Sequence, residues 1–112
     1  MNQAELKRVV AGLASIRWPE DLDAWMDARD EAGFESAWQR VFDLVEATPR
    51  PAWLEQLCAQ AFTTTFDGTR NPEVAAQVSD DLDLIGRALV TGVEDPWLAE
   101  LESPYLKGRL PG

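Results

Sequence analysis

The helical spacing of apolar residues is the feature that most limits what this chain can fold into. Apolar side chains recur three and four positions apart through nearly the whole chain, which gathers them on one face of each expected helix. Leu6, Val9, Val10 and Leu13 begin the pattern. No segment alternates with period two for long enough to predict a strand. The sequence therefore predicts an all-α fold, a single-domain bundle of five to six helices.

Proline and glycine mark the expected limits of the first half of the bundle. Pro19 suits the first turn of a second helix, where its missing N–H costs nothing, and Gly33 suits the end of that helix. A third helix is expected over residues 34–45, before the break at "TPRP", residues 48–51. A fourth helix follows over residues 53–62.

Capping residues mark the second half. The stretch "TTTFDGTRN", residues 63–71, contains an Asp-Gly pair and predicts a loop. Asn71 and Pro72 are favoured types for a cap and a first helical position, so they predict the start of the longest helix, which Gly92 should end.

The C-terminal part is expected to be less regular. A short helix is expected over residues 96–101, followed by a final turn at residues 103–104. The tail "KGRLPG", residues 107–112, is expected to fray.

Length and composition predict one domain over residues 1–112. The chain is 46% hydrophobic and shows no internal repeat or Gly/Ser-rich linker. The N-terminus lacks the pattern of a secretory signal, and no run of apolar residues is long enough to span a membrane. A single cysteine, Cys58, fits a reducing compartment. We therefore expect a cytoplasmic protein.

The residues that most enzymes need are missing. The chain has no histidine and one cysteine, which excludes Ser–His–Asp and Cys–His catalysis and thiolate zinc sites. No glycine-rich loop has phosphate-binding spacing. Carboxylates alone can bind Mg²⁺ or Ca²⁺, but the acids of "SDDLD", residues 79–83, point in different directions on a helix. We expect no catalytic residues, no metal and no cofactor; a carboxylate-metal enzyme is the third hypothesis.

Negative charge is concentrated in two segments. The chain has 20 acidic and 10 basic residues, a net charge of −10. Residues 18–33 contribute −5 and residues 79–102 contribute −6, so the remainder sums to +1. Nucleic acid and anionic membrane surfaces are poor direct partners for such a chain. A basic protein partner is the expectation.

The first acidic segment, "WPEDLDAWMDARDEAG", places its acids on one side of a helix. At about 100° per residue, five carboxylates fall within roughly a quarter of the circumference. Like charges four residues apart destabilise a helix slightly, and no lysine offsets them. The pattern indicates a docking surface; the alternative is the ordinary preference of acids for helix starts. These candidate residues are Glu20, Asp23, Asp27, Asp30 and Glu31.

The remaining candidates come from tryptophans beside acids and from the second segment. Aromatic side chains flanked by charge are common in interface hot spots. We therefore add Trp25, Asp80, Asp83, Asp95 and Trp97 as candidate partner-binding residues. For the tryptophans the alternative is core packing, and for Asp83 it is a simple surface ion pair with Arg87, four residues later.

Asp81 stands apart, because it falls in the middle of the apolar face of the longest expected helix. An unpaired carboxylate buried there would cost several kcal/mol. It is either a structural carboxylate that caps a helix or pairs with an arginine such as Arg17, Arg40 or Arg70, or a residue that lines a groove on the bundle.

The charge pattern favours a stoichiometric inhibitor that masks a basic protein, and an enzyme that acts on nucleic acid is an obvious target. The stretch "VSDDLDLIGRALVTGVEDPWLAELESPYLKGRLP", residues 78–111, resembles the small acidic immunity and antitoxin proteins that neutralise bacterial toxins. The resemblance implies a dedicated toxin partner and a bacterial cytoplasm, and it carries over no site residues. The alternative is a non-catalytic adaptor or subunit module, which would use an apolar helix face.

Overall fold

The computed structural model describes residues 1–111, and over that range it contains helices and no strands. The predicted all-α bundle is therefore confirmed, with six α-helices and one 3₁₀ turn. The elements are α1 (Gln3–Gly12), η1 (Leu13–Ser15), α2 (Leu22–Arg29), α3 (Ala32–Val45), α4 (Ala52–Thr69), α5 (Pro72–Thr91) and α6 (Pro96–Leu106).

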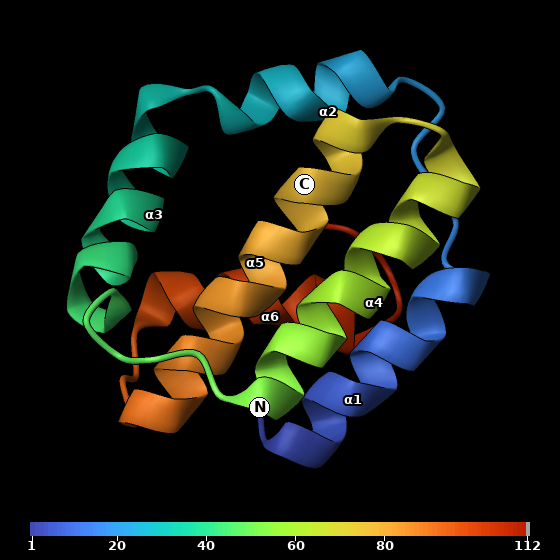
Figure 1. The fold of residues 1–112 in the computed structure, drawn as a ribbon. Helices are drawn as coiled ribbons and strands as arrows, with labels where there is room; N and C mark the ends of the chain where they lie inside the picture. Colours follow the sequence, from blue (N-terminus) through green and yellow to red (C-terminus); the bar gives the residue numbers. More distant parts are fainter. Residues whose placement is uncertain (112) are drawn as a thin grey trace.

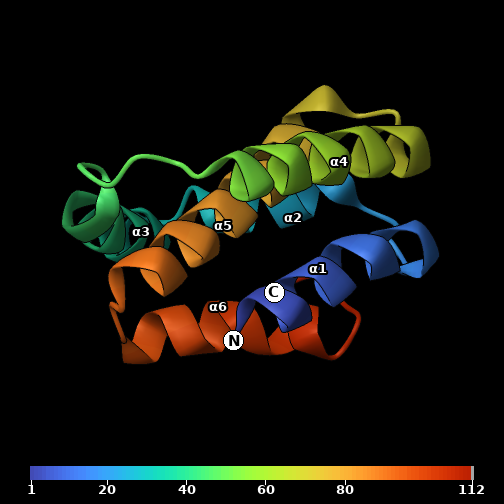
Figure 2. The same cartoon turned by 60° about the horizontal axis from the view of Figure 1, so that its bottom comes forward.

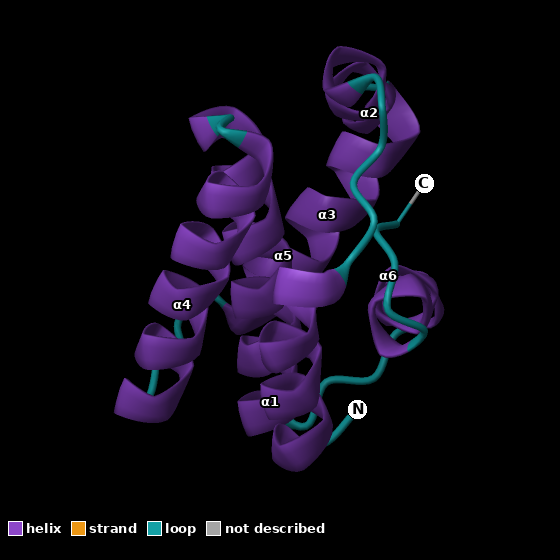
Figure 3. Ribbon diagram, turned by 90° about the vertical axis from the view of Figure 1, so that its right-hand side faces the viewer, coloured by secondary structure: helices purple, strands orange, loops and turns teal. Residues whose placement is uncertain are grey.

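The two longest helices form the centre of the molecule. α4 and α5 run side by side, with α3 packed along α5 and α1 beside α4 (Figure 1). α1 and α6 together form a second layer beneath this pair (Figure 2). α2 lies across one end of the bundle, and the segment after α6 runs up towards it (Figure 3). No helix among residues 1–111 is long and apolar enough to cross a membrane.

α5 is the central helix because its apolar face is almost completely buried. Val74, Val78, Leu82 and Ile85 are at most 1% exposed. Gly86 lets α4 approach closely, since a Cβ at this position would overlap the side chain of Leu54. Close packing of this kind is what the helical spacing of apolar residues predicts.

The predicted caps of α5 are confirmed. The Asn71 side chain accepts hydrogen bonds from the backbone N–H of Glu73 at 3.0 Å and of Val74 at 3.1 Å. Gly92 ends the helix in the left-handed region with φ 75°, which glycine adopts without steric cost.

The loop predicted over residues 63–71 is wrong, because α4 continues to Thr69. Buried contacts override the local turn signal: Thr65 is fully buried, and Gly68 lies so close to Trp18 that a Cβ there would meet the indole ring. The helix ends only at Arg70, whose φ is 55°.

Three other helix limits also differ from expectation. α2 ends at Arg29, and Gly33, which was expected to end it, lies in the first turn of α3. Pro19 lies outside α2, which begins at Leu22 with the Asp21 side chain as its cap. α6 continues through Pro104 instead of restarting there. Both sides of that proline are anchored in the core, since Leu101 is 4% and Tyr105 2% exposed.

The tail does not fray over residues 107–111. Leu110 is 7% exposed, and the carbonyl oxygen of Pro111 accepts a 2.7 Å hydrogen bond from Nε1 of Trp25. Leu110 and Pro111 therefore belong to the core beneath α2, whereas Lys107, Gly108 and Arg109 before them are exposed.

Candidate functional site

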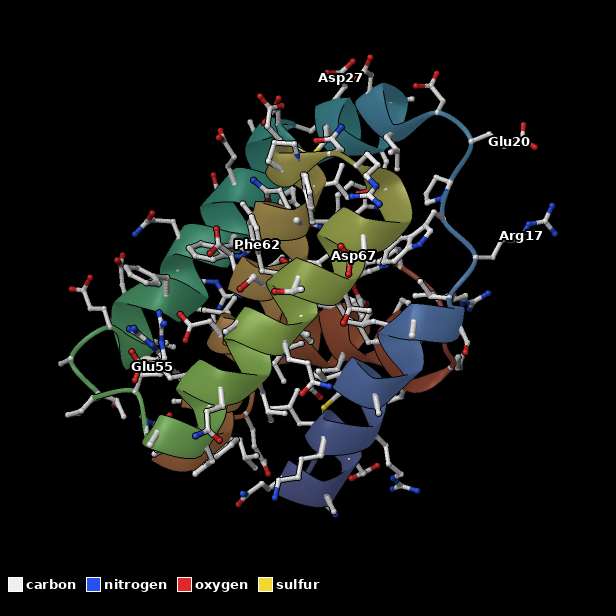
Figure 4. All side chains as sticks on the ribbon, turned by 45° about the vertical axis from the view of Figure 1, so that its right-hand side comes forward. Arg17, Glu20, Asp27, Glu55, Phe62 and Asp67 are labelled. Atoms are coloured by element: carbon white, nitrogen blue, oxygen red, sulfur yellow. The ribbon has the colours of Figure 1, made fainter. Side chains whose placement is uncertain are left out.

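Five carboxylates gather along one edge of the molecule, and we call them the acidic edge. All five are exposed, and none takes part in an ion pair within residues 1–111. Two of them, Glu20 and Asp27, point outward along the α2 side of the molecule (Figure 4). The acidic edge therefore carries negative charge that the described part of the chain does not pair. Its members are Glu20, Asp23, Asp27, Asp30 and Glu31.

The opposite face of α2 anchors this edge to the core. Trp25 is 8% exposed and Arg29 is 6% exposed. The Arg29 guanidinium lies 4.6 Å from the centroid of the Trp25 ring and 4.5 Å from that of Phe34, between two aromatic faces. Such cation–π contacts are strongest when they are shielded from water. Trp25, a candidate for partner contact, thus lies in the core beneath the acidic edge.

Asp81 is completely buried and has two partners. Its Oδ1 is paired with Nη2 of Arg29, and its Oδ2 accepts a 2.7 Å hydrogen bond from the Tyr105 hydroxyl. The structural alternative considered for this carboxylate is therefore the one observed. The network joins α2, α5 and α6 through a single side chain.

The arginine partners expected for Asp81 are wrong, because Arg29 takes that place. Arg17 points outward before α2 (Figure 4); Arg40 pairs with Asp95, and Arg70 lies over Phe66 at the end of α4. Arg29 carried a usable signal. It follows Leu22, Trp25 and Met26 at helical spacing, so it lies on the inward stripe of α2.

Burial dominates the electrostatics of this network. It raises the pKa of Asp81, against the opposing effects of Arg29 and the Tyr105 hydroxyl. Burial, followed by the charge of Asp81, raises the pKa of Tyr105 well above its usual value. The Tyr105 hydroxyl therefore keeps its proton at neutral pH, and the network acts as a structural clamp for α2.

Asp83, an acid of the second segment, forms ion pairs within the fold. Asp83 lies 2.8 Å from Nε of Arg50 and 3.2 Å from Nε of Arg87. The ion pair with Arg87 considered from the sequence is therefore present, with Arg50 as an additional partner. This pairing leaves Asp83 with little charge to offer a second protein.

Asp95 is also occupied within the fold. It pairs with Arg40, and its Oδ1 caps α6 by accepting a 2.9 Å hydrogen bond from the backbone N–H of Trp97. The hydrogen bond from Arg40, helped by the backbone N–H groups that the carboxylate caps, lowers the pKa of Asp95. The half-buried Trp97 ring packs edge-on against Phe34, with 5.4 Å between centroids. These two candidates thus lie at a junction between helices.

Asp80 lies in a groove between α3 and α5, which we call the α3–α5 groove. Its volume is about 910 Å³, within the range of small-ligand pockets. Partial desolvation, followed by the charge of Asp83, raises the pKa of Asp80. The lining residues that bear on function are Arg29, Phe34, Glu35, Trp38, Asp43, Gln77 and Asp80.

Glu35 and Asp43 are groove acids that the sequence interpretation missed. They lie eight residues apart, with Gln39 between them, and so form a polar stripe along α3. That stripe was a usable signal, but nothing in the sequence placed it opposite Asp80. Within residues 1–111, no three His, Cys, Asp or Glu side chains are placed to hold a metal ion.

Comparison with known proteins identifies a family. No curated protein matches the chain. The family model described as "Immunity protein PIM1" matches residues 11–112, which is nearly the whole chain. The match supports a toxin-neutralising role, with a toxin as the partner. The chain belongs to the PIM1 family of immunity proteins.

Proposed function

We propose that this protein is a stoichiometric, non-catalytic inhibitor that binds a basic toxin directly in the bacterial cytoplasm. The observation that carries the proposal is the acidic edge, five exposed carboxylates without an ion-pair partner among residues 1–111. An unneutralised patch of one sign speeds encounter with a patch of the opposite sign and orients the two proteins.

A toxin that acts on nucleic acid fits this surface best. The cleft of such an enzyme must be positive in order to hold phosphates. An acidic helix can occupy that cleft and exclude the substrate. Asp83 and Asp95 are paired within the fold, so among the predicted partner-binding carboxylates the free charge lies on the acidic edge and on Asp80.

The alternative, an adaptor module, requires an apolar contact face. The large exposed apolar side chains are Leu44, Phe62, Val90 and Leu106, on four different helices. Among residues 1–111, no single helix carries a stripe of them. The distribution supports docking through charge.

The test is protection of bacterial cells from a toxin, sought first among the products of the genes that neighbour the gene of this protein. The edge variant Asp23→Asn/Asp27→Asn/Asp30→Asn is compared with a control variant, Glu55→Gln/Asp67→Asn/Glu100→Gln. The control changes the net charge equally at exposed positions on α4 and α6 (Figure 4).

We expect the edge variant to slow association with the purified toxin about tenfold at low salt, with little change at high salt. The control variant should associate as fast as the wild type. If both variants associated equally slowly, the slowing would come from the change in net charge alone, which would contradict the role of the acidic edge. If the wild-type chain neither binds nor protects against the toxin, the proposed function itself fails.

A further inference from the structure

The α3–α5 groove holds three carboxylates that the fold leaves unneutralised. Within residues 1–111, Glu35, Asp43 and Asp80 take part in no ion pair. The two arginines that line the groove are already committed, Arg29 to Asp81 and Arg40 to Asp95. The groove is therefore net negative and favours a cationic occupant.

The aromatic rings that line the groove favour a guanidinium group over other cations. The ring of Phe34 already covers one face of the Arg29 guanidinium, at 4.5 Å. Trp38 is half-buried and stacks on Phe42, with 5.3 Å between centroids. A planar guanidinium stacks flat on such a ring while its edge pairs with a carboxylate through two parallel hydrogen bonds, a geometry that a compact ammonium group lacks.

The groove also contains a donor that lacks an acceptor. The Arg29 side chain is buried, with an exposed fraction of 6%. Its Nη1 nevertheless has no hydrogen-bond partner within the described residues. Its Nε makes only a long hydrogen bond, 3.3 Å, to Oε1 of Gln77. A buried donor without an acceptor costs about 1–3 kcal/mol. Arg29 and Gln77 both line the groove, so an acceptor that enters it and replaces the long Gln77 contact can bind the guanidinium.

These requirements together select one kind of occupant. A simple amine would satisfy the carboxylates but would offer no acceptor to Arg29. An anion or nucleic acid would satisfy Arg29 but would be repelled by the carboxylates. A peptide segment with an arginine carries both a guanidinium and backbone carbonyl groups.

We propose that the α3–α5 groove is the anchor site for an arginine-bearing segment of the toxin. The guanidinium lies beside Trp38 among the carboxylates of Glu35, Asp43 and Asp80. A backbone carbonyl of the same segment accepts a hydrogen bond from the Arg29 guanidinium. The inference rests on the proposed function and adds to it a second contact point. The acidic edge steers the toxin, and the groove holds it.

The probe is the blocked tripeptide acetyl-Gly-Arg-Gly-amide, titrated into the ¹⁵N-labelled full-length chain. The matched probe replaces arginine by citrulline, which has the same shape and no charge. Side-chain N–H resonances of Trp38, Gln77 and Arg29 report directly on the groove. We expect the arginine peptide to shift these resonances and the citrulline peptide to leave them in place.

A groove variant, Glu35→Gln/Asp43→Asn/Asp80→Asn, tests the residues. It should weaken binding of the arginine peptide at least tenfold, while Glu55→Gln/Asp67→Asn/Glu100→Gln should bind within twofold of the wild type. Because all six positions are exposed, both variants are expected to fold, and an unchanged thermal midpoint checks this.

The proposal is overturned by absence of binding, by shifts confined to other surfaces, by equal binding of the two peptides, or by full binding of the groove variant. In the toxin-protection assay, a groove variant that protects as well as the wild type also overturns it. That last result leaves the proposed function standing, whereas failure of the wild-type chain to protect refutes the function independently of the groove.

Discussion

The hydroxyl of Tyr105 donates a 2.7 Å hydrogen bond to Oδ2 of Asp81, and this contact ties α6 to the middle of α5. The other oxygen of the same carboxylate is paired with Arg29 from α2. A completely buried carboxylate thus joins three helices. Because α2 is short, this network and the hydrogen bond from Trp25 to the tail hold the acidic edge in place.

Asp81→Ala should lower the free energy of unfolding by about 3–5 kcal/mol, because it leaves Arg29 buried without its counter-charge. Urea unfolding measures the loss. The exposed neighbour provides the control: Asp80→Ala should stay within about 0.5 kcal/mol of the wild type. If Asp81→Ala lost no more unfolding free energy than Asp80→Ala is expected to lose, the network would contribute little to stability.

The stability that Asp81 contributes should fall as the pH rises. Burial raises its pKa in the folded protein above the ordinary value of an aspartate, so the folded state holds the proton more tightly than the unfolded chain does. The contribution is full below the unfolded pKa and is lost as the pH rises through the folded pKa. Asp81→Asn, which cannot titrate, is the reference.

Urea unfolding of both proteins at several pH values above about 4 tests the sign. The advantage of the wild type over Asp81→Asn should shrink with increasing pH. An advantage that grows with pH would mean that Arg29 and Tyr105 outweigh burial and lower the pKa of Asp81.

Cys58 should resist alkylation in the folded protein. Its side chain is 4% exposed, and burial raises the pKa of its thiol to about 11, whereas only the thiolate reacts. We expect iodoacetamide at pH 8 to modify the native protein at least ~100-fold more slowly than the urea-unfolded chain. Mass spectrometry follows the reaction, and comparable rates in the two states would refute the buried placement.

Gly86→Ala should destabilise the protein by about 1–3 kcal/mol, the usual cost of overpacking. The added methyl group would overlap the side chain of Leu54 and force α4 away from α5. Gly33→Ala is the matched control, because a Cβ there meets open space; it should raise stability by up to about 1 kcal/mol. Thermal unfolding that ranks the two variants in the opposite order would contradict the helix spacing described here.

The edge variant Asp23→Asn/Asp27→Asn/Asp30→Asn should keep the stability of the wild type to within about 0.5 kcal/mol, with any change favouring the variant. Asp23 and Asp27 repel each other one helical turn apart, an effect of a few tenths of a kcal/mol that salt screens. Thermal unfolding at low and high salt measures it. A loss above about 1 kcal/mol would show that these acids serve the fold and are not free for a partner.

The sequence by itself determined the helices, several of their ends and the acidic stripe of α2. These features depend on residues a few positions apart: the spacing of Val74, Val78 and Leu82, the cap at Asn71, and the glycine at position 92. Local turn signals failed where tertiary contacts were stronger. The Asp-Gly pair stays helical because Gly68 packs beneath Trp18.

Only the tertiary structure decided which charges remain free. Arg29 and Asp81 are 52 residues apart in the sequence, and no local pattern predicts that they form an ion pair. The same is true of Asp95 with Arg40, and of Asp80 opposite Glu35 and Asp43. Helix formation is governed by near neighbours along the chain, whereas pairing and groove formation depend on how helices distant in sequence pack together.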